Sequence, residues 1–216
     1  HFKIKDIWKI ALPIMIGGVA QNLVTVTDTA FLGQIGEVEL GAAGNAGILY
    51  FLFVITGMGF TSGAQIIIGR RNGEKNYNQI GGLIDQSFYF VIPLGIILIG
   101  LLYFVMPLVL EGIIHSAQIY AASTEYLKFR SFGIIFAFLT FILNSFYIGT
   151  TNTRILIYST FVMAIVNVTL DYGLIFGHFG LPEMGIKGAA LASVIAELVA
   201  CIFLMAYTFY KVDLEK

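Results

Sequence analysis

The stretch QNLVTVTDTAFLG, from Gln21 to Gly33, decides the fold because it places an aspartate inside a long apolar run. The run extends from Ile7 to Leu32, and a helix needs about 20 such residues to cross about 30 Å of hydrocarbon. An ionisable side chain facing lipid would cost at least about 2.5–3.5 kcal/mol. Asp28 is therefore expected to face either the interior of a helix bundle or water.

The composition of the whole chain agrees with a membrane environment. Of its 216 residues, 58% are hydrophobic and 12% are charged, whereas a soluble domain has roughly 45–50% apolar and about 25% charged residues. A net charge of -1 offers no basic surface for a nucleic acid. The single Cys201 excludes an internal disulfide and a cysteine cluster for zinc. We expect an integral membrane protein in the lipid bilayer, with no cofactor and no nucleic-acid partner.

Six apolar segments are long enough to span the membrane, which predicts an all-α polytopic protein. The breaks between them are short and polar, so we predict one domain covering residues 1–216. The chain begins at His1 without a Met, and we therefore expect a piece of a longer protein. The predicted spans are residues 7–32, 40–68, 80–110, 120–148, 155–177 and 186–210.

The distribution of Lys and Arg predicts the orientation, since these residues collect in cytoplasmic loops. Nine of them fall on one side of the predicted bundle, and three fall on the other. Both ends of the segment are therefore expected in the cytoplasm, with the spans in the plasma membrane, the inner membrane of a bacterium. The majority side carries Lys3, Lys5, Lys9, Arg70, Arg71, Lys75, Arg154, Lys211 and Lys216, and the other side carries Lys128, Arg130 and Lys187.

A second acid, Asp171, lies near the end of the fifth span, as Asp28 lies near the end of the first. Both spans run in the same direction, so a rise of about 1.5 Å per residue puts the two carboxyl groups at a similar depth. Each acid has polar companions on its own helix face, Gln21 and Thr25 beside Asp28 and Asn167 beside Asp171. Two acids with amide and hydroxyl companions predict a functional site between the helices.

The surroundings of the two acids also resemble each other. VTVTDTAFLGQIG followed by GAAGNAG parallels VNVTLDYGLIFGHFG followed by GAALASV. Internal repeats are common in transporters, and their binding sites often lie at the interface between the repeats. A duplicated two-helix element would explain the common depth of the acids.

Two further residues have more than one interpretation. Pro13 removes a backbone hydrogen bond from the first span and favours a kink, which either bends during function or is static. Glu197 follows Ser193 by four residues on the sixth span. It is either a third polar group of a cavity or a protonated structural acid bonded to a neighbouring helix.

Several of these stretches together resemble the amino-terminal half of a multidrug and toxic compound extrusion (MATE) transporter. They are IALPIMIGGVAQNLVTVTDTAFLGQIG, GRRNGEKN, GTTNTR, NVTLDYGLIFG and GIKGAALAS. The resemblance covers essentially the whole chain. Members of that family have twelve spans in two six-helix lobes, which implies that this chain is the amino-terminal lobe and that its own carboxy-terminal lobe is a partner absent from the sequence.

The resemblance implies secondary active efflux of amphipathic, often cationic, compounds in exchange for inward H⁺ or Na⁺. It assigns ion coupling, with a possible Na⁺ site, to Asp28, Asn167 and Asp171. Pro13 matches the family's bending proline. The expected substrate cavity comprises Gln21, Thr25, Tyr126, Asn144, Ser193 and Glu197. Where many members have an arginine and Gly-Asp-Thr after the fourth span, this chain has YIGTTNTR, which leaves the subfamily open.

Two alternative functions differ in the chemistry they need. A lipid-linked oligosaccharide flippase of the related superfamily would need Arg and Lys in its cavity to hold diphosphate, whereas here the spans contain acids and almost all bases lie in loops. An intramembrane aspartyl protease also needs two acids on separate spans. No Gly-x-Gly-Asp occurs on another span, so we expect a transporter and not an enzyme.

Overall fold

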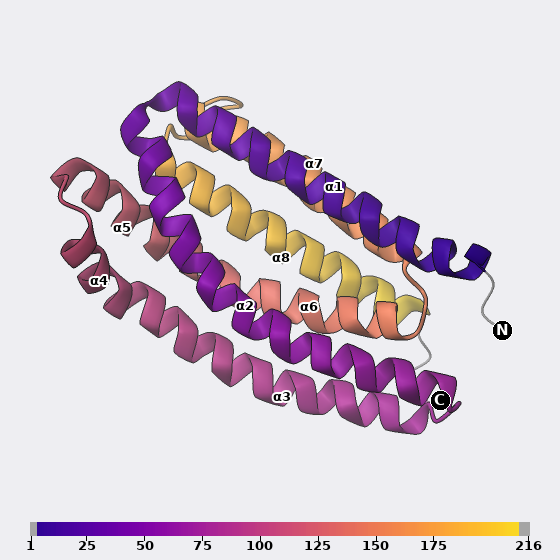
Figure 1. Ribbon diagram of the computed structural model, residues 1–216. Helices are drawn as coiled ribbons and strands as arrows, with labels where there is room; N and C mark the ends of the chain where they lie inside the picture. Colours follow the sequence, from indigo (N-terminus) through magenta and orange to yellow (C-terminus); the bar gives the residue numbers. More distant parts are fainter. Residues whose placement is uncertain (1–3, 212–216) are drawn as a thin grey trace.

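The computed structural model describes residues 4–211, and all regular structure within them is helical (Figure 1). Short turns join the successive helices. The helices are α1 (Ile4–Ile35), α2 (Glu37–Gly73), α3 (Asn78–Gly100), the π-helical turn η1 (Leu101–Val105), α4 (Met106–Ile113), α5 (Ala117–Ser131), α6 (Gly133–Gly149), α7 (Arg154–Phe176) and α8 (Ile186–Lys211).

These helices form six candidate membrane spans within the described residues, as the sequence predicts. Five are helices that are long and apolar enough by themselves, one of which runs continuously from Asn78 to Ile113. The sixth is the pair α5 and α6, which bends by 44° at Phe132. Ser131 and Gly133 flank this bend, and such pairs are a common cause of sharp kinks. The prediction of a single fourth helix over residues 120–148 therefore missed a bend, and only Gly36 separates α1 from α2.

The helices are arranged in two groups that α8 connects. On one side α1 lies along α7, and α7 lies along α8 (Figure 1). On the other side α2 packs against α5 and α6, and α3 packs against α6. Because α8 also contacts α5 and α6, it forms the wall shared by both groups.

Two glycines lie where neighbouring helices approach each other closely. A Cβ atom at Gly188 would lie 2.6 Å from the carbonyl oxygen of Leu174, so α8 packs directly on the backbone of α7. A Cβ atom at Gly149 would lie 2.6 Å from Cγ2 of Ile68, where α6 meets α2. Small residues at such positions let membrane helices gain van der Waals contact. Gly188 thereby sets the spacing of α7 and α8.

Hydrogen bonds from side chains to distant backbone carbonyls tie further helices together. Ser145 donates to the carbonyl of Thr61 at 2.8 Å between α6 and α2. Thr153 donates to the carbonyl of Ile10 at 3.3 Å, one turn before the buried Pro13. The α1 helix continues without interruption through Pro13.

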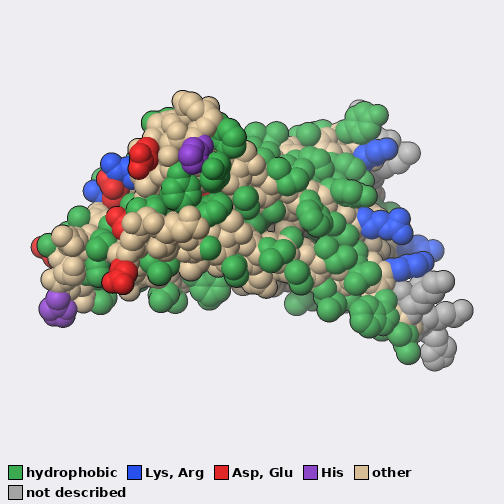
Figure 2. Space-filling view, turned by 90° about the horizontal axis from the view of Figure 1, so that it is seen from above, with side chains coloured by type: hydrophobic (Ala, Val, Ile, Leu, Met, Phe, Trp, Pro, Cys, Tyr) green, Lys and Arg blue, Asp and Glu red, His purple; other side chains and the backbone are tan. Residues whose placement is uncertain are grey.

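Apolar side chains fill the space between α2, α3, α5 and α6, and they also cover the outside of the molecule. The main core cluster includes the fully buried Phe138, Leu102 and Ile134. Outside, hydrophobic side chains cover the middle of the molecule and the charged side chains lie towards its two ends (Figure 2). An apolar exterior between charged ends is the surface that a bilayer requires.

Candidate functional site: an internal cavity with two polar centres

A cavity of about 530 Å³ lies between α1, α2 and the four helices α5 to α8. It brings together every residue that the sequence predicts for the substrate cavity, and two of the three predicted for ion coupling. The predicted residues that line it are Gln21, Thr25, Asp28, Tyr126, Asn144, Asn167, Ser193 and Glu197. The third ion-coupling residue, Asp171, is completely buried on α7, the helix that packs along α1.

The first polar centre consists of Asp28 on α1 and of Asn167 and Asp171 on α7. Asn167 and Asp171 are four residues apart and therefore share one face of α7. Four oxygen atoms in this centre are buried without a hydrogen-bond partner: Oδ1 of Asp28, Oδ1 of Asn167 and both carboxyl oxygens of Asp171. Buried polar atoms are nearly always paired, and each exception needs an explanation. A cluster of unpaired hard oxygen atoms is suited to holding a proton or a small cation.

Ser193 fixes the orientation of the Asn167 amide. The Nδ2 atom of Asn167 donates to Oγ of Ser193 at 3.4 Å, across the α7–α8 contact. Because the amide nitrogen is used in this way, the amide oxygen is left as an acceptor with no donor. The close α7–α8 packing at Gly188 therefore contributes to the first polar centre.

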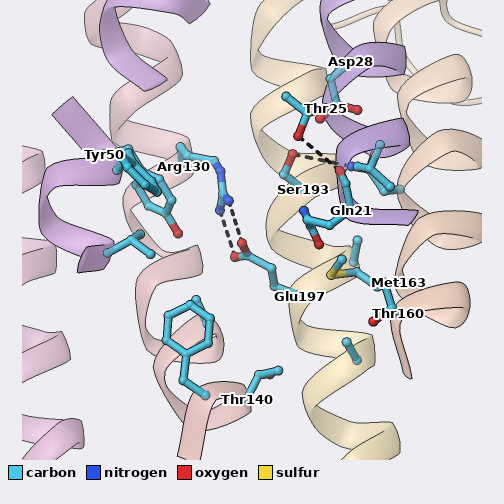
Figure 3. A pocket seen from close by; sticks show the side chains of 18 of the residues that line it. Gln21, Thr25, Asp28, Tyr50, Arg130, Thr140, Thr160, Met163, Ser193 and Glu197 are labelled. Carbon is cyan, nitrogen blue, oxygen red and sulfur yellow. Dashed lines mark hydrogen bonds and ion pairs between the residues drawn. The ribbon is translucent and has the colours of Figure 1, made fainter. Parts of the chain in front are cut away.

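On α1, Thr25 and Gln21 form the cavity wall before Asp28. The hydroxyl of Thr25 donates to the backbone carbonyl of Gln21 at 3.2 Å. Its proton is thus committed to its own helix, and its oxygen remains as an acceptor. Figure 3 shows both residues with Asp28 on the side of the cavity opposite Tyr50.

The second polar centre is an ion pair between Arg130 on α5 and Glu197 on α8 (Figure 3). Nη1 donates to Oε2 at 2.8 Å and Nη2 donates to Oε1 at 2.5 Å, so the pair is bidentate. The side chains are only 13% and 17% exposed. The guanidinium also stacks on the ring of Tyr50, with 4.1 Å between Cζ and the ring centroid.

This pair gives Glu197 features of both interpretations, but Glu197 is the ion-pair partner of Arg130 and not a protonated acid. Glu197 lines the cavity, and it is bonded to a neighbouring helix.

Sequence reasoning missed Arg130 as a cavity residue and counted it among the bases of the outer side. The argument that almost all bases lie in loops is wrong at this position, since Arg130 lines the cavity. A signal was present in the sequence. Arg130 follows Tyr126, a predicted cavity residue, by four residues, and residues so spaced share a helix face.

The chain is similar in sequence to a family of known proteins. The family model described as MatE matches residues 13–173, which is most of the chain. The chain belongs to the MatE family. Among relatives, the "Probable multidrug resistance protein NorM" of Agrobacterium fabrum is 27% identical over 216 residues, which is 100% of this chain and 46% of that protein. The protein of the same name from Thermotoga maritima is 30% identical over 96% of this chain and 44% of its own.

Solved structures of MatE relatives share the fold. One described as the outward-facing conformation of a multidrug resistance MATE family transporter superposes with a TM-score of 0.89 at 20% identity, over 97% of this chain and 46% of that one. A transporter of the MOP superfamily from Pyrococcus furiosus gives a TM-score of 0.88 over 97% of this chain and 45% of its own. The chain thus spans about half the length of its relatives and has the fold of one transporter lobe.

Proposed function

We propose that this chain is the amino-terminal lobe of a secondary active efflux transporter that exchanges amphipathic, often cationic, compounds for inward H⁺ or Na⁺. The observation that carries the proposal is the set of unpaired buried oxygens of Asp28, Asn167 and Asp171, of which Asp28 and Asn167 line the cavity. The names of the relatives, which are multidrug resistance proteins, support the substrate class.

The proposed mechanism is competition for negative charge. Two ionised carboxylates in contact repel strongly where the effective dielectric is low, so a proton or Na⁺ bound between Asp28 and Asp171 relieves the repulsion. Na⁺ would in addition be coordinated by the amide oxygen of Asn167. A cationic compound in the same cavity is attracted by the same charge, and entry of the ion therefore favours release of the compound. If the ion binds more tightly to one of two arrangements of α1 than to the other, ion binding would shift α1 between them and so change access to the cavity.

The orientation of the chain in the membrane, with both described ends on the cytoplasmic side, is part of the proposal. The described ends of the chain and the α2–α3 turn lie at the same end of the molecule (Figure 1). Arg70, Arg71 and Lys75 are at that turn, which supports a cytoplasmic position under the positive-inside rule. The other lobe would face this cavity from the side of α1 and α2. Thiol labelling of a cysteine introduced at Asn76, from either side of sealed vesicles, tests the orientation.

The presence of Arg130 in the cavity gives little support to the flippase alternative. A diphosphate needs several uncompensated bases, and the one base that lines this cavity is neutralised by Glu197. The carboxyl oxygens without a partner belong to the other polar centre, at Asp28 and Asp171.

The experiment uses the full-length protein in proteoliposomes, with a fluorescent organic cation as substrate. Export is measured under an imposed pH gradient and, separately, under a Na⁺ gradient. We expect one gradient to drive export and Asp28→Asn to lower the driven rate at least about tenfold. Asp85→Asn is the matched control, because Asp85 lines a separate cavity between α3, α6 and α8. Undiminished gradient-driven export by Asp28→Asn would refute the assignment of the ion site.

A further inference from the structure

The guanidinium of Arg130 retains hydrogen-bonding capacity inside the cavity. Arginine has five N–H donors, and Glu197 accepts from two of them. Within residues 4–211 this guanidinium makes no other hydrogen bond by distance and angle. The neighbouring Tyr50 hydroxyl is also buried without a partner. Arg130 and Tyr50 thus offer unpaired donors at the end of the cavity away from Asp28.

The position of the guanidinium is built into the fold. The ion pair lies directly over Gly133, at the start of α6, where an added Cβ atom would collide with Nη1 of Arg130 and Oε2 of Glu197. The bend between α5 and α6 and the missing side chain together provide the space. Tyr50 packs on the guanidinium from α2. Three helices therefore hold Arg130 in place, which is the preorganisation that a binding group requires.

The two polar centres lie on opposite sides of the cavity, and α8 adjoins both of them (Figure 3). Glu197 follows Ser193 by four residues on α8, a rise of about 6 Å, and Ser193 contacts Asn167 of the first centre. The residues of α8 that contact the two centres are therefore about one helical turn apart, and the guanidinium and Asp28 face the cavity from opposite sides (Figure 3). A molecule that carries a cationic group at one end and an oxyanion at the other complements both centres.

We propose that Arg130 is a specificity-determining residue that binds an oxyanion group, such as a carboxylate, of the transported compound. The inference rests on the proposed function, and it names the residue of this cavity that would hold the anionic group of such a compound. Arginine is suited to this role, since its planar fork binds carboxylates in a bidentate manner. Glu197 neutralises the guanidinium while the cavity is empty, and a substrate carboxylate then binds the remaining N–H donors beside Tyr50.

The test compares two dyes that differ in one group: a rhodamine with a free carboxylate and the ethyl ester of the same rhodamine. Binding of each dye to the purified full-length protein is measured by fluorescence anisotropy. The variant is Arg130→Met combined with Glu197→Met, which removes both charges and leaves neither one buried alone. We expect the preference for the acid over the ester, the ratio of their Kd values, to fall at least about tenfold.

The outcomes separate this inference from the proposed function. If wild-type protein exports the ester along an ion gradient but shows no preference for the acid, the inference fails and the proposed function stands. An equal loss of affinity for both dyes in the double variant also overturns the inference, because it indicates that the pair only joins α5 to α8. If the ratio falls as expected but neither gradient drives export, the inference holds and the antiport proposal fails.

A lipid headgroup is the other source of an oxyanion. The dye measurements are therefore repeated in nanodiscs with and without phosphatidylglycerol. Displacement of the acid dye alone by this lipid, in wild-type protein and not in the double variant, would assign Arg130 to lipid and overturn the inference.

Discussion

Replacing Gly188 by alanine tests how the packing of two helices supports the first polar centre. The new Cβ atom would lie 2.6 Å from the Leu174 carbonyl oxygen and 2.7 Å from its carbon. An unstrained carbon contact is about 3.5 Å, so α7 and α8 must separate by nearly 1 Å or rotate. Neither atom belongs to a flexible side chain that could move aside.

The expected energetic cost can be worked out from this overlap. Overpacking in a well-packed interior costs typically about 1–3 kcal/mol. Replacing glycine by alanine recovers about 0.4–1 kcal/mol through the unfolded chain. We expect Gly188→Ala to destabilise the protein by about 1–2 kcal/mol. The same displacement moves Ser193 away from the Asn167 amide, which lies at 3.4 Å in the intact contact.

The assay is the thermal unfolding midpoint of the full-length protein in detergent. Gly18→Ala is the matched control, because Gly18 also lies inside a helix and an added Cβ atom there has no neighbour within 4 Å. The control should unfold at the wild-type midpoint or above it, and Gly188→Ala below it. Equal midpoints for the two variants would refute the reasoning that backbone contact at Gly188 sets the α7–α8 distance.

Three other substitutions probe the remaining contacts by the same unfolding assay. Glu197→Gln should destabilise the protein by about 3–5 kcal/mol because Arg130 is left without a counter-charge, and the double methionine variant should regain most of this loss. Ser145→Ala should cost about 1 kcal/mol, since the carbonyl of Thr61 loses its 2.8 Å side-chain donor. Glu74→Gln should lower the midpoint at pH 7 only slightly, because the exposed ion pairs of Glu74 stabilise little.

The pH dependence of the Glu74 contact has a definite sign. Hydrogen bonds from Arg70 and then Arg71 lower the pKa of the Glu74 carboxyl below its usual value. A lowered pKa in the folded state means that the contribution is present above the unfolded-state pKa and is lost as the pH falls through the folded-state value. Wild type and Glu74→Gln should therefore converge at acidic pH. A difference that grows on acidification would contradict this sign.

Much of the fold could be predicted from the sequence because the bilayer imposes a strong constraint. Each span must supply about 20 apolar residues and satisfy its own backbone hydrogen bonds, so uninterrupted apolar runs identify helices. The bend between α5 and α6 could not be located in this way. Hydropathy reports how apolar a segment is and not the direction of its helix axis. Ser131 and Gly133 are ordinary residues of membrane helices until the packing of this region against α8 is known.

The repeat in the sequence places an acid near the end of two helices, but it does not predict how its two copies pack. Asp28 lies on α1 and Asp171 on α7, and these two helices pack against each other. The Gly-Ala-Ala motif, however, has different environments in its two copies. Gly188 lies against the backbone of α7, whereas a Cβ atom at Gly41 would only touch Cδ1 of Ile119 at 3.9 Å. Similar sequences can thus conserve the depth of a residue without conserving the contacts around it.

Arg130 shows why a charge near the end of a predicted span is ambiguous. Counting the Lys and Arg residues of the loops assigns such a base to the membrane surface, where arginine is common and remains solvated by water. Its true position depends on Glu197, 67 residues away in the chain, and no local pattern reports that pairing. Once this pairing is known, the charged side chains that line the cavity can be divided into those with and those without a partner of opposite charge. Glu197 is compensated by Arg130, whereas Asp28 has no cationic partner within hydrogen-bond or ion-pair distance among residues 4–211. The carboxyl groups without a counter-charge therefore lie on the α1–α7 side of the cavity, which is also where buried oxygens lack donors.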